Sequence, residues 1–262
     1  MITSTTNQRV KEIIQLQKKS RTRNQAGVFI VEGIRMAREV PKEQLVRLYV
    51  TEEFYQKHRE ELPEGDVQPE LVSPSVFEVM SDTRTPQGVL AVVRQSTYSE
   101  EKLLKAGNAH LLVLDNLQDP GNLGTIFRTA EAAGVTGILM SRDCVDIYNP
   151  KTIRSTMGAI FRMPFVYSAD IIETIKRLKG QDIRIYAAHL NGKQTYDRED
   201  YRGKTAFLIG NEGNGLRREV AECADIWIRI PMEGQAESLN AAVAASILMF
   251  EVSRQRRKWR KG

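Results

Sequence analysis

Polar residues that could take part in chemistry follow three apolar runs, at residues 111–114, 206–209 and 225–230, each predicted to be a buried strand. Five of these residues have side chains able to contact or activate a ligand: Asn122, Arg128, Glu212, Ser238 and Asn240. Because the carboxyl ends of parallel strands meet at one edge of a sheet, the three loops that follow these strands can converge. The sequence therefore predicts a ligand site at that edge.

The first of these segments reads as a strand, a polar loop, a helix and a second strand. The apolar run at 111–114 is followed by the loop at 115–122, then by about three helical turns that Gly134 is well placed to end. Residues 137–140 form the second strand of this βαβ unit. On this stretch alone, an ordinary capped turn between strand and helix is an equally good interpretation.

A glycine-rich loop, GNEGNG, follows the second apolar run. Gly210, Gly213 and Gly215 would let the backbone approach a ligand closely. The loop does not fit the dinucleotide pattern G-x-G-x-x-G, and Arg198 stands where a phosphate-binding loop ending at Thr205 would need its first glycine. These features suit a small, partly apolar molecule held largely by backbone groups.

The charge of the chain is concentrated at its two ends. The formal net charge is +5. Residues 1–25 carry six basic side chains against Glu12, residues 254–262 carry six basic side chains, and the rest of the chain has a net charge of −6. Basic ends on an acidic body predict a polyanionic partner, most plausibly nucleic acid, although solvated termini would give the same pattern.

Cysteine content and hydropathy exclude several other classes of protein. Cys144 and Cys223 lie far apart, which argues against a disulfide scaffold or a zinc site and is typical of a reducing compartment. The first residues lack the apolar core of a signal peptide, and the apolar stretch at 241–250 is too short to span a bilayer. We expect a cytoplasmic protein without a metal or a membrane partner.

The order of predicted elements indicates two α/β domains. Residues 1–95 alternate helices and strands, residues 96–109 read as a linker with one short helix, and residues 110–262 form a second domain. Its last helix is expected to begin at Ser238 as N-cap and to run to about Trp259. By pattern alone, the second domain would be drawn as an unknotted, doubly wound parallel sheet.

Three segments carry a resemblance to a known family. NLQDPGNLGTIFRTAEAAG, LIGNEGNGL and IPMEGQAESLNAAVAASILMFE occur in this order within residues 110–262. They resemble the three motifs of the SpoU (TrmH) RNA 2′-O-ribose methyltransferases, which belong to the SPOUT superfamily. More weakly, FIVEG at 29–33 and QGVLAVV at 87–93 resemble the family's accessory substrate-binding domain, which is similar to a ribosomal-protein RNA-binding fold.

The resemblance implies a fold that the pattern does not predict. Family members thread their C-terminal segment through a loop, and the resulting trefoil knot forms the pocket for S-adenosylmethionine. They act as homodimers with the active site at or near the interface, so the last helix would pack in that interface. No metal is required.

The resemblance also implies a role for each candidate residue. Three residues match positions that hold the cofactor, chiefly through backbone groups: Gly210, Ile230 and Leu239. Arg128 matches the arginine proposed to help deprotonate the ribose 2′-hydroxyl, either with a substrate phosphate or by stabilising the developing alkoxide. Asn122 matches the asparagine near the reacting ribose. The remaining matches position Arg128 and the loops or complete the third motif: Glu212, Ser238 and Asn240.

The resulting expectation is an S-adenosylmethionine-dependent methyltransferase that acts on the ribose 2′-hydroxyl of structured RNA. Ribosomal RNA is favoured as the substrate because the N-terminal part resembles a ribosomal-protein fold, and transfer RNA is the second choice. The alternative from another class is a non-catalytic RNA-binding or ribosome-assembly protein on the same fold. The motif arginine and glycines are all present, which favours the enzyme. The modified nucleotide is not encoded in any of these motifs.

Overall fold

The structure, a computed structural model, describes residues 1–62 and 67–259. The chain divides into two compact units. The first contains residues 1–97 together with residues 146–161, and the second contains residues 98–145 and the chain from 162 onward.

The first unit is built on a four-stranded mixed sheet in the order β1-β4-β2-β3. The strands are β1 (Val28–Glu32), β2 (Leu45–Thr51), β3 (Glu70–Val72) and β4 (Val89–Arg94). Strand β4 runs antiparallel to both β1 and β2, and β3 runs parallel to β2. The helices of this unit are α1 (Gln8–Lys18), α2 (Ser20–Ala26), α3 (Ile34–Ala37), α4 (Glu52–His58), α5 (Pro74–Met80), α8 (Pro150–Thr156) and the 3₁₀ turns η1 (Lys42–Gln44), η2 (Arg59–Glu61) and η3 (Ala159–Phe161).

The N-terminal basic segment forms two helices, because Lys19 adopts an extended conformation between α1 and α2. Val10 and Ile13 of α1 are buried in the core of the unit. Arg23 is also buried. It forms an ion pair with Asp146 at 2.5 Å and donates to the carbonyl oxygen of Leu16 at 2.6 Å. Arg23 is therefore an internal cation, although the sequence counted it in the basic N-terminal segment expected to meet a polyanionic partner.

Residues 146–161 group with the first unit, although the sequence placed them in the second domain. Tyr148 lies against Phe29 with ring centroids 4.7 Å apart, and Arg154 forms an ion pair with Asp82 at 2.9 Å. These partners are remote in sequence, so local periodicity could not reveal the grouping.

The second unit is built on a seven-stranded sheet in the order β7-β6-β5-β10-β8-β11-β9, in which every neighbouring pair is parallel. The strands are β5 (His110–Leu114), β6 (Gly137–Ser141), β7 (Phe165–Ser168), β8 (Arg184–Ala188), β9 (Gln194–Thr195), β10 (Thr205–Ile209) and β11 (Ile226–Arg229). The helices are α6 (Glu100–Leu104), α7 (Pro120–Ala133), α9 (Ile171–Lys179), α10 (Arg218–Ala221), α11 (Ala241–Trp259) and the 3₁₀ turn η4 (Tyr196–Arg198). The predicted parallel α/β class is confirmed.

The order in which successive strands are added to the sheet reverses between β5 and β10, while all strands stay parallel. The chain runs outward from β5 through β6 to β7 and later returns, so that β10 pairs with β5 and Ile209 lies opposite Leu114. Such a reversal is the usual position of a ligand site in an open parallel sheet. The loops after β5 and β10 lie on its two sides.

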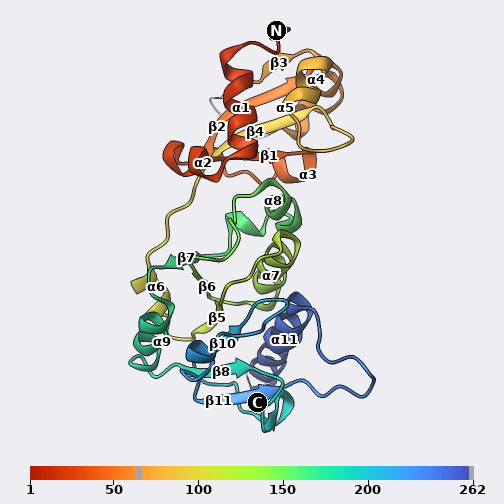
Figure 1. Cartoon of the computed structure of the whole chain (residues 1–262). Coiled ribbons are helices and arrows are strands. Elements are labelled where there is room, and N and C mark those ends of the chain that lie inside the picture. Colours follow the sequence, from red (N-terminus) through yellow and green to blue (C-terminus); the bar gives the residue numbers. More distant parts are fainter. Residues whose placement is uncertain (63–66, 260–262) are drawn as a thin grey trace. The chain divides into compact units, whose positions relative to one another are not determined.

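Helices cover both faces of this sheet (Figure 1). On one face, α9 and α10 pack over the alternating apolar residues of β5, β8 and β10. Leu103 and Leu104 of α6 belong to the same core, so part of the expected linker at 96–109 contributes to this unit. On the other face, α7 packs against α11, and α11 also contacts β10.

Helix α7 begins at Pro120, inside the segment 115–122 that the sequence predicted to be a loop, and it ends where Gly134 was predicted to end it. The side chain of Asp119 accepts a hydrogen bond from the backbone N–H of Asn122 at 2.8 Å, and Pro120 is the first helical residue. Gly134 ends the helix in the left-handed conformation, with φ 76°.

Helix α11 begins at Ala241, so the prediction that Ser238 caps it is wrong. The cap is Asn240, whose side-chain oxygen accepts from the backbone N–H groups of Ala242 at 2.9 Å and Val243 at 3.3 Å. Asn240 lies directly before the first turn, where its short amide reaches both donors. Ser238 lies too far upstream to do so.

The C-terminal end of α11 is anchored within the second unit. Arg256 donates to the carbonyl oxygens of Ala109 at 2.9 Å and Gly203 at 2.6 Å, and Arg254 pairs with Glu251. Part of the expected basic tail is thus engaged internally. Arg260 and Lys261, also counted in that tail, lie outside the described residues.

Three structural features bear on the classes that the sequence excluded. Among residues 1–62 and 67–259, no helix is both long and apolar enough to cross a bilayer. Cys144 and Cys223 are free thiols. Within the same ranges, no three His, Cys, Asp or Glu side chains are grouped as metal ligands.

His110 makes stability depend on pH. The residue is buried in β5 beside Phe207, and burial together with the nearby charge of Arg256 lowers its pKa from 6.5 to about 3. The unfolded chain therefore binds a proton at a higher pH than the folded protein. The neutral, buried state of His110 therefore contributes to the free energy of unfolding. This contribution is fully present above about pH 6.5 and is lost as the pH falls toward 3, by at most about 1.4 kcal/mol per pH unit.

We expect His110→Phe, which keeps an aromatic ring at this position, to weaken that dependence. Urea unfolding at pH 7 and pH 5 measures it as the change in free energy of unfolding. The wild type should lose more stability than the variant between the two pH values. Equal losses would show that His110 is not responsible.

Candidate functional site

Three of the predicted polar residues form one hydrogen-bonded line across the carboxyl edge of the second sheet. The side-chain nitrogen of Asn122, in the first turn of α7, donates to Glu212 at 3.1 Å. The side-chain oxygen of Asn122 accepts from the amide of Asn240 at 2.9 Å. The segments that follow β5, β10 and β11 are therefore joined through side chains, as the convergence argument predicts. The bonded partners are 90 residues apart for Asn122 and Glu212 and 118 residues apart for Asn122 and Asn240.

Glu212 also holds the loop that leads into α7. Its carboxylate accepts from the backbone N–H groups of Gln118 at 3.1 Å and Asp119 at 2.8 Å. Burial opposes ionisation of this carboxyl, but these two donors and the Asn122 amide outweigh it and lower the pKa of Glu212. Glu212 is thus an ionised group that fixes the position of α7 relative to the glycine-rich loop.

The glycine-rich loop closes on itself. Asn211 and Gly215 exchange two backbone hydrogen bonds, each 2.9 Å long, and Gly215 has a φ of 69°. A Cβ atom at Gly210 would collide with the backbone of Gly215 and Leu216. Only glycine fits at position 210, because the two ends of the loop touch there.

A cavity of ≈ 660 Å³ lies between this loop, the loop after β8 and the loop after β11. Its lining contains all three residues expected to hold a cofactor, Gly210, Ile230 and Leu239, and also Glu212 and Ser238. The volume suits a small molecule, and the wall combines apolar side chains with backbone groups. S-adenosylmethionine fits this donor set, since its adenine is apolar on both faces and its polar groups can bind exposed peptide groups.

Arg128 and Ser238 stand apart from the hydrogen-bonded line. Arg128 is exposed on α7, two turns beyond Asn122, and makes no hydrogen bond or ion pair with any other described residue. Ser238 is exposed at the cavity and also lacks a hydrogen bond within the described chain. The idea that Glu212 and Ser238 orient Arg128 is therefore not supported by a contact and stays a prediction.

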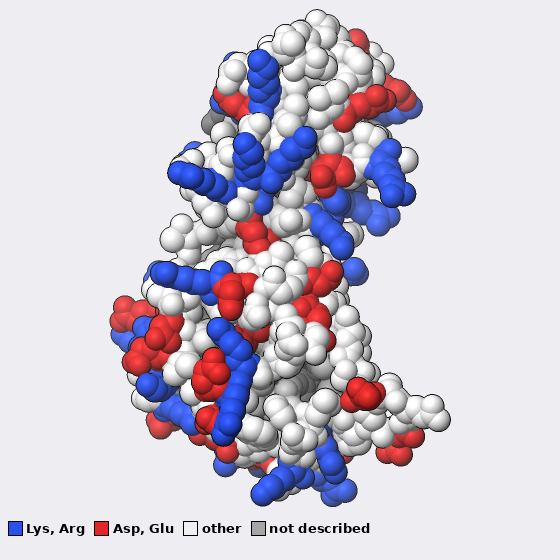
Figure 2. Space-filling model, in the orientation of Figure 1, with Lys and Arg blue, Asp and Glu red and all other residues white. Residues whose placement is uncertain are grey.

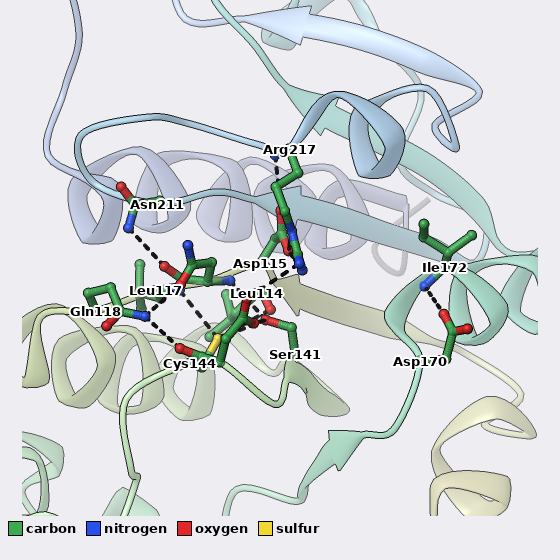
Figure 3. Close-up of polar contacts among 12 residues, drawn as sticks. Leu114, Asp115, Leu117, Gln118, Ser141, Cys144, Asp170, Ile172, Asn211 and Arg217 are labelled. Carbon is green, nitrogen blue, oxygen red and sulfur yellow. Dashed lines mark hydrogen bonds and ion pairs between the residues drawn. The ribbon is translucent and has the colours of Figure 1, made fainter.

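The sequence did not single out a second set of contacts beneath the loops. Asp115, directly after β5, is completely buried and is bound by Arg217, directly after the glycine-rich loop and Leu216 (Figure 3). Arg217 also approaches Asp143 at 3.3 Å. The signal in the sequence was a carboxylate immediately after a strand buried on both faces, which needs a partner.

Cys144 supports the same loop from the other side. Its sulfur accepts from the backbone N–H of Leu117 at 3.3 Å and donates to the carbonyl oxygen of Leu114 at 3.4 Å (Figure 3). Burial raises the pKa of this thiol, so it stays protonated at neutral pH. Cys144 is a packing and hydrogen-bonding residue.

Comparison with known families gives a match in each unit. Residues 109–250 match the SpoU rRNA Methylase family, and residues 7–91 match the MRM3-like substrate binding domain.

Two similar proteins are named as enzymes of ribosomal RNA. The chain is 34% identical over 254 residues to the 23S rRNA (guanosine(2553)-2′-O)-methyltransferase RlmP of Bacillus subtilis, covering 96% of this chain and 98% of that protein. It is 39% identical over 176 residues to the 23S rRNA (guanosine-2′-O-)-methyltransferase RlmB of Xylella fastidiosa, covering 65% of this chain and 71% of that protein.

Solved structures agree with the fold. The SpoU methyltransferase AviRb from Streptomyces viridochromogenes in complex with AdoMet superposes with a TM-score of 0.85 at 26% identity, covering 96% of this chain and 98% of that chain. The AdoMet-bound rRNA methyltransferase from Sinorhizobium meliloti gives 0.84 at 30% identity, with 97% of each chain covered. The resemblance noted in the sequence is confirmed, and this chain belongs to the SpoU rRNA methylase family.

Proposed function

We propose that this protein transfers a methyl group from S-adenosylmethionine to the ribose 2′-hydroxyl of a nucleotide in ribosomal RNA. The observation that carries the proposal is the hydrogen-bonded line Glu212–Asn122–Asn240, which joins the three family motifs beside the cavity at Gly210. Because two similar proteins are named as guanosine 2′-O-methyltransferases of 23S rRNA, we favour a guanosine of 23S rRNA as the target.

The cavity residues would hold the cofactor in two ways. Ile230 and Leu239 supply apolar contacts, and the loop from Gly210 to Gly215 supplies backbone donors and acceptors. When bound, S-adenosylmethionine supplies an electrophilic methyl group. Asn122 and Asn240 keep the loops around the cavity in register. The amide of Asn122 uses both its nitrogen and its oxygen in the hydrogen-bonded line, and the amide of Asn240 donates to Asn122 while its oxygen caps α11.

We assign to Arg128 the stabilisation of the negative charge that develops on the 2′-oxygen. The 2′-hydroxyl must lose its proton as its oxygen forms the new bond. A guanidinium has a pKa above about 12, so at neutral pH it is a poor base. Arg128 is exposed and has no hydrogen-bond or ion-pair partner within the described chain. Its guanidinium can therefore stabilise the developing negative charge on that oxygen. A phosphate of the substrate could take up the proton beside it.

The proposal predicts one stoichiometric 2′-O-methyl group when unmodified 23S rRNA is incubated with the protein and labelled S-adenosylmethionine. The site is mapped by its resistance to alkaline cleavage. Arg128→Ala should lower the rate of transfer roughly a hundredfold or more, while calorimetry shows nearly unchanged cofactor affinity, because Arg128 does not line the cavity.

Arg177→Ala is the matched control, since Arg177 is an exposed arginine of α9 on the other face of the same sheet. Its rate should equal that of the wild type. Equal loss of transfer and of cofactor binding in Arg128→Ala would refute the assigned role. Transfer to transfer RNA alone would refute the choice of substrate, and cofactor binding without transfer to either RNA would favour the non-catalytic alternative.

We also propose that the protein is a homodimer whose interface contains α11. Val243 and Phe250 are 47% and 44% exposed, and the half-buried Ile247 lies between them on the same face of α11. This apolar stripe lies on the helix that packs against α7, which carries Arg128. A second copy covering the stripe would bring the active site close to the interface.

The dimer proposal predicts that the double variant Val243→Asp, Phe250→Asp is a monomer, because two charges would be buried without partners. Light scattering after size exclusion measures the mass. Val79→Asp is the matched control, since Val79 is also 47% exposed but belongs to α5 of the first unit. A monomeric wild type, or a double variant that stays dimeric, would contradict the proposal.

The trefoil knot is part of the same proposal. The packing of α11 supports it. Helix α11 follows β11, two strands from the centre of the sheet, yet it packs against α7 and β10. The chain must therefore return across the sheet edge on which the glycine-rich loop lies. Threading beneath that loop would place the loops after β10 and β11 around one cavity.

We assign RNA binding to the first unit. Figure 2 shows lysine and arginine side chains over this unit, in the region where Figure 1 has α1 and α2. Four exposed cations there make no ion pair within the described chain: Lys11, Lys18, Lys19 and Arg21. Such cations suit phosphate contacts. Ribosomal RNA as substrate would place the protein in the cytoplasm, and its free cysteines suit that reducing compartment.

A further inference from the structure

We propose that Arg217 is a positioning residue that sets the affinity of the cofactor site by fixing the glycine-rich loop to the end of β5. The proposal rests on the cavity at Gly210 being the S-adenosylmethionine site. Arg217 does not line that cavity, whereas its neighbour Leu216 does. Any effect of Arg217 on the cofactor must therefore pass through the loop.

The contact between Arg217 and Asp115 uses both carboxylate oxygens. The backbone N–H of Arg217 donates to Oδ2 at 3.0 Å, and its Nε donates to Oδ1 at 2.8 Å, with Nη2 bound to the same oxygen. Asp115 is 0% exposed, so removing the guanidinium would leave a buried charge with one backbone donor. The hydrogen bonds to Asp115 raise the pKa of Arg217.

Arg217 fixes the end of a loop whose beginning is already fixed. The backbone N–H of Asp115 donates to the carbonyl oxygen of Ile209 at 2.8 Å, at the end of the pairing of β5 with β10 and directly before Gly210. Seven residues later, Arg217 returns to Asp115. Both ends of the glycine-rich loop are thus attached to the same residue of the strand that carries the first motif.

Two further contacts attach the middle of the loop. The amide of Asn211 donates to the carbonyl oxygen of Asn116 at 2.9 Å, and Glu212 binds the backbone of Gln118 and Asp119 (Figure 3 shows the Asn211 contact). Asn116 itself has a φ of 53°, a conformation that needs support from its surroundings. The loop after β5 and the glycine-rich loop are therefore held together by hydrogen bonds along their length.

The glycines of the loop explain why this attachment matters for binding. Gly213 and Gly215 make the loop flexible when it is free, and a flexible wall must lose conformational entropy each time a ligand binds. Arg217 removes that freedom in advance. Its side chain is 40% exposed, so its truncation does not open a cavity in the core.

The test compares Arg217→Gln with Arg218→Gln in the full-length protein. Arg218 is the matched control because it is the adjacent arginine and its ion pair, with Glu222, stays within α10 and the residue after it. Calorimetry with S-adenosylmethionine should show a dissociation constant raised on the order of tenfold in Arg217→Gln, equivalent to about 1.4 kcal/mol. Arg218→Gln should bind as the wild type does.

Steady-state transfer separates positioning from general destabilisation. At saturating cofactor, Arg217→Gln should keep a kcat within about twofold of the wild type while its KM for S-adenosylmethionine rises with the dissociation constant. Arg217→Lys, which keeps a cation but loses the forked geometry, should recover part of the affinity. This variant also serves if Arg217→Gln does not fold.

Each other result overturns the inference. An unchanged dissociation constant in Arg217→Gln, with or without a lower Tm, would leave Arg217 a purely structural residue. A loss of kcat at unchanged KM would place Arg217 in the chemistry rather than in cofactor binding. A wild type that binds no S-adenosylmethionine would refute the proposed function itself, independently of Arg217.

Discussion

The parallel pairing of β5 with β10 is the interaction on which the rest of the candidate site depends. These strands come from distant parts of the sequence and meet at the centre of the sheet, where the order in which strands are added reverses. Their last pair, Leu114 and Ile209, sets the loops at 115–119 and 210–217 side by side. The polar contacts between these two loops, among them those of Glu212 with Asp119 and of Arg217 with Asp115, require that register.

Much of this arrangement could be predicted from local sequence. The apolar runs predicted the central strands, and Gly134 predicted the end of α7. The convergence of Asn122 with Glu212 followed from a general property of parallel sheets, since loops after neighbouring strands share one edge. The motif resemblance then supplied the cofactor and the reaction class, which periodicity and composition alone did not specify.

The remaining features depend on contacts between residues that are remote in sequence. The buried Arg23 has its ion-pair partner, Asp146, far along the chain, and residues 146–161 group with the first unit through contacts such as that of Tyr148 with Phe29. Asn240, rather than Ser238, caps α11 because two backbone donors lie within its reach, a geometric difference that two suitable capping residues in one segment do not reveal. Likewise, the sequence does not reveal the partner of Asp115, because Arg217 lies 102 residues away and reaches it only in the folded chain.

The most direct test of the central claim, that the glycine-rich loop forms the cofactor site, is calorimetry of S-adenosylmethionine binding to Gly210→Ala. Gly203→Ala is the control, because a Cβ atom there meets nothing within 4 Å. The account predicts that the wild type and Gly203→Ala bind alike. Gly210→Ala should remain folded by circular dichroism but bind at least roughly tenfold more weakly, because its methyl group forces the loop open. Equal binding by all three proteins, or no binding by the wild type, would contradict the account.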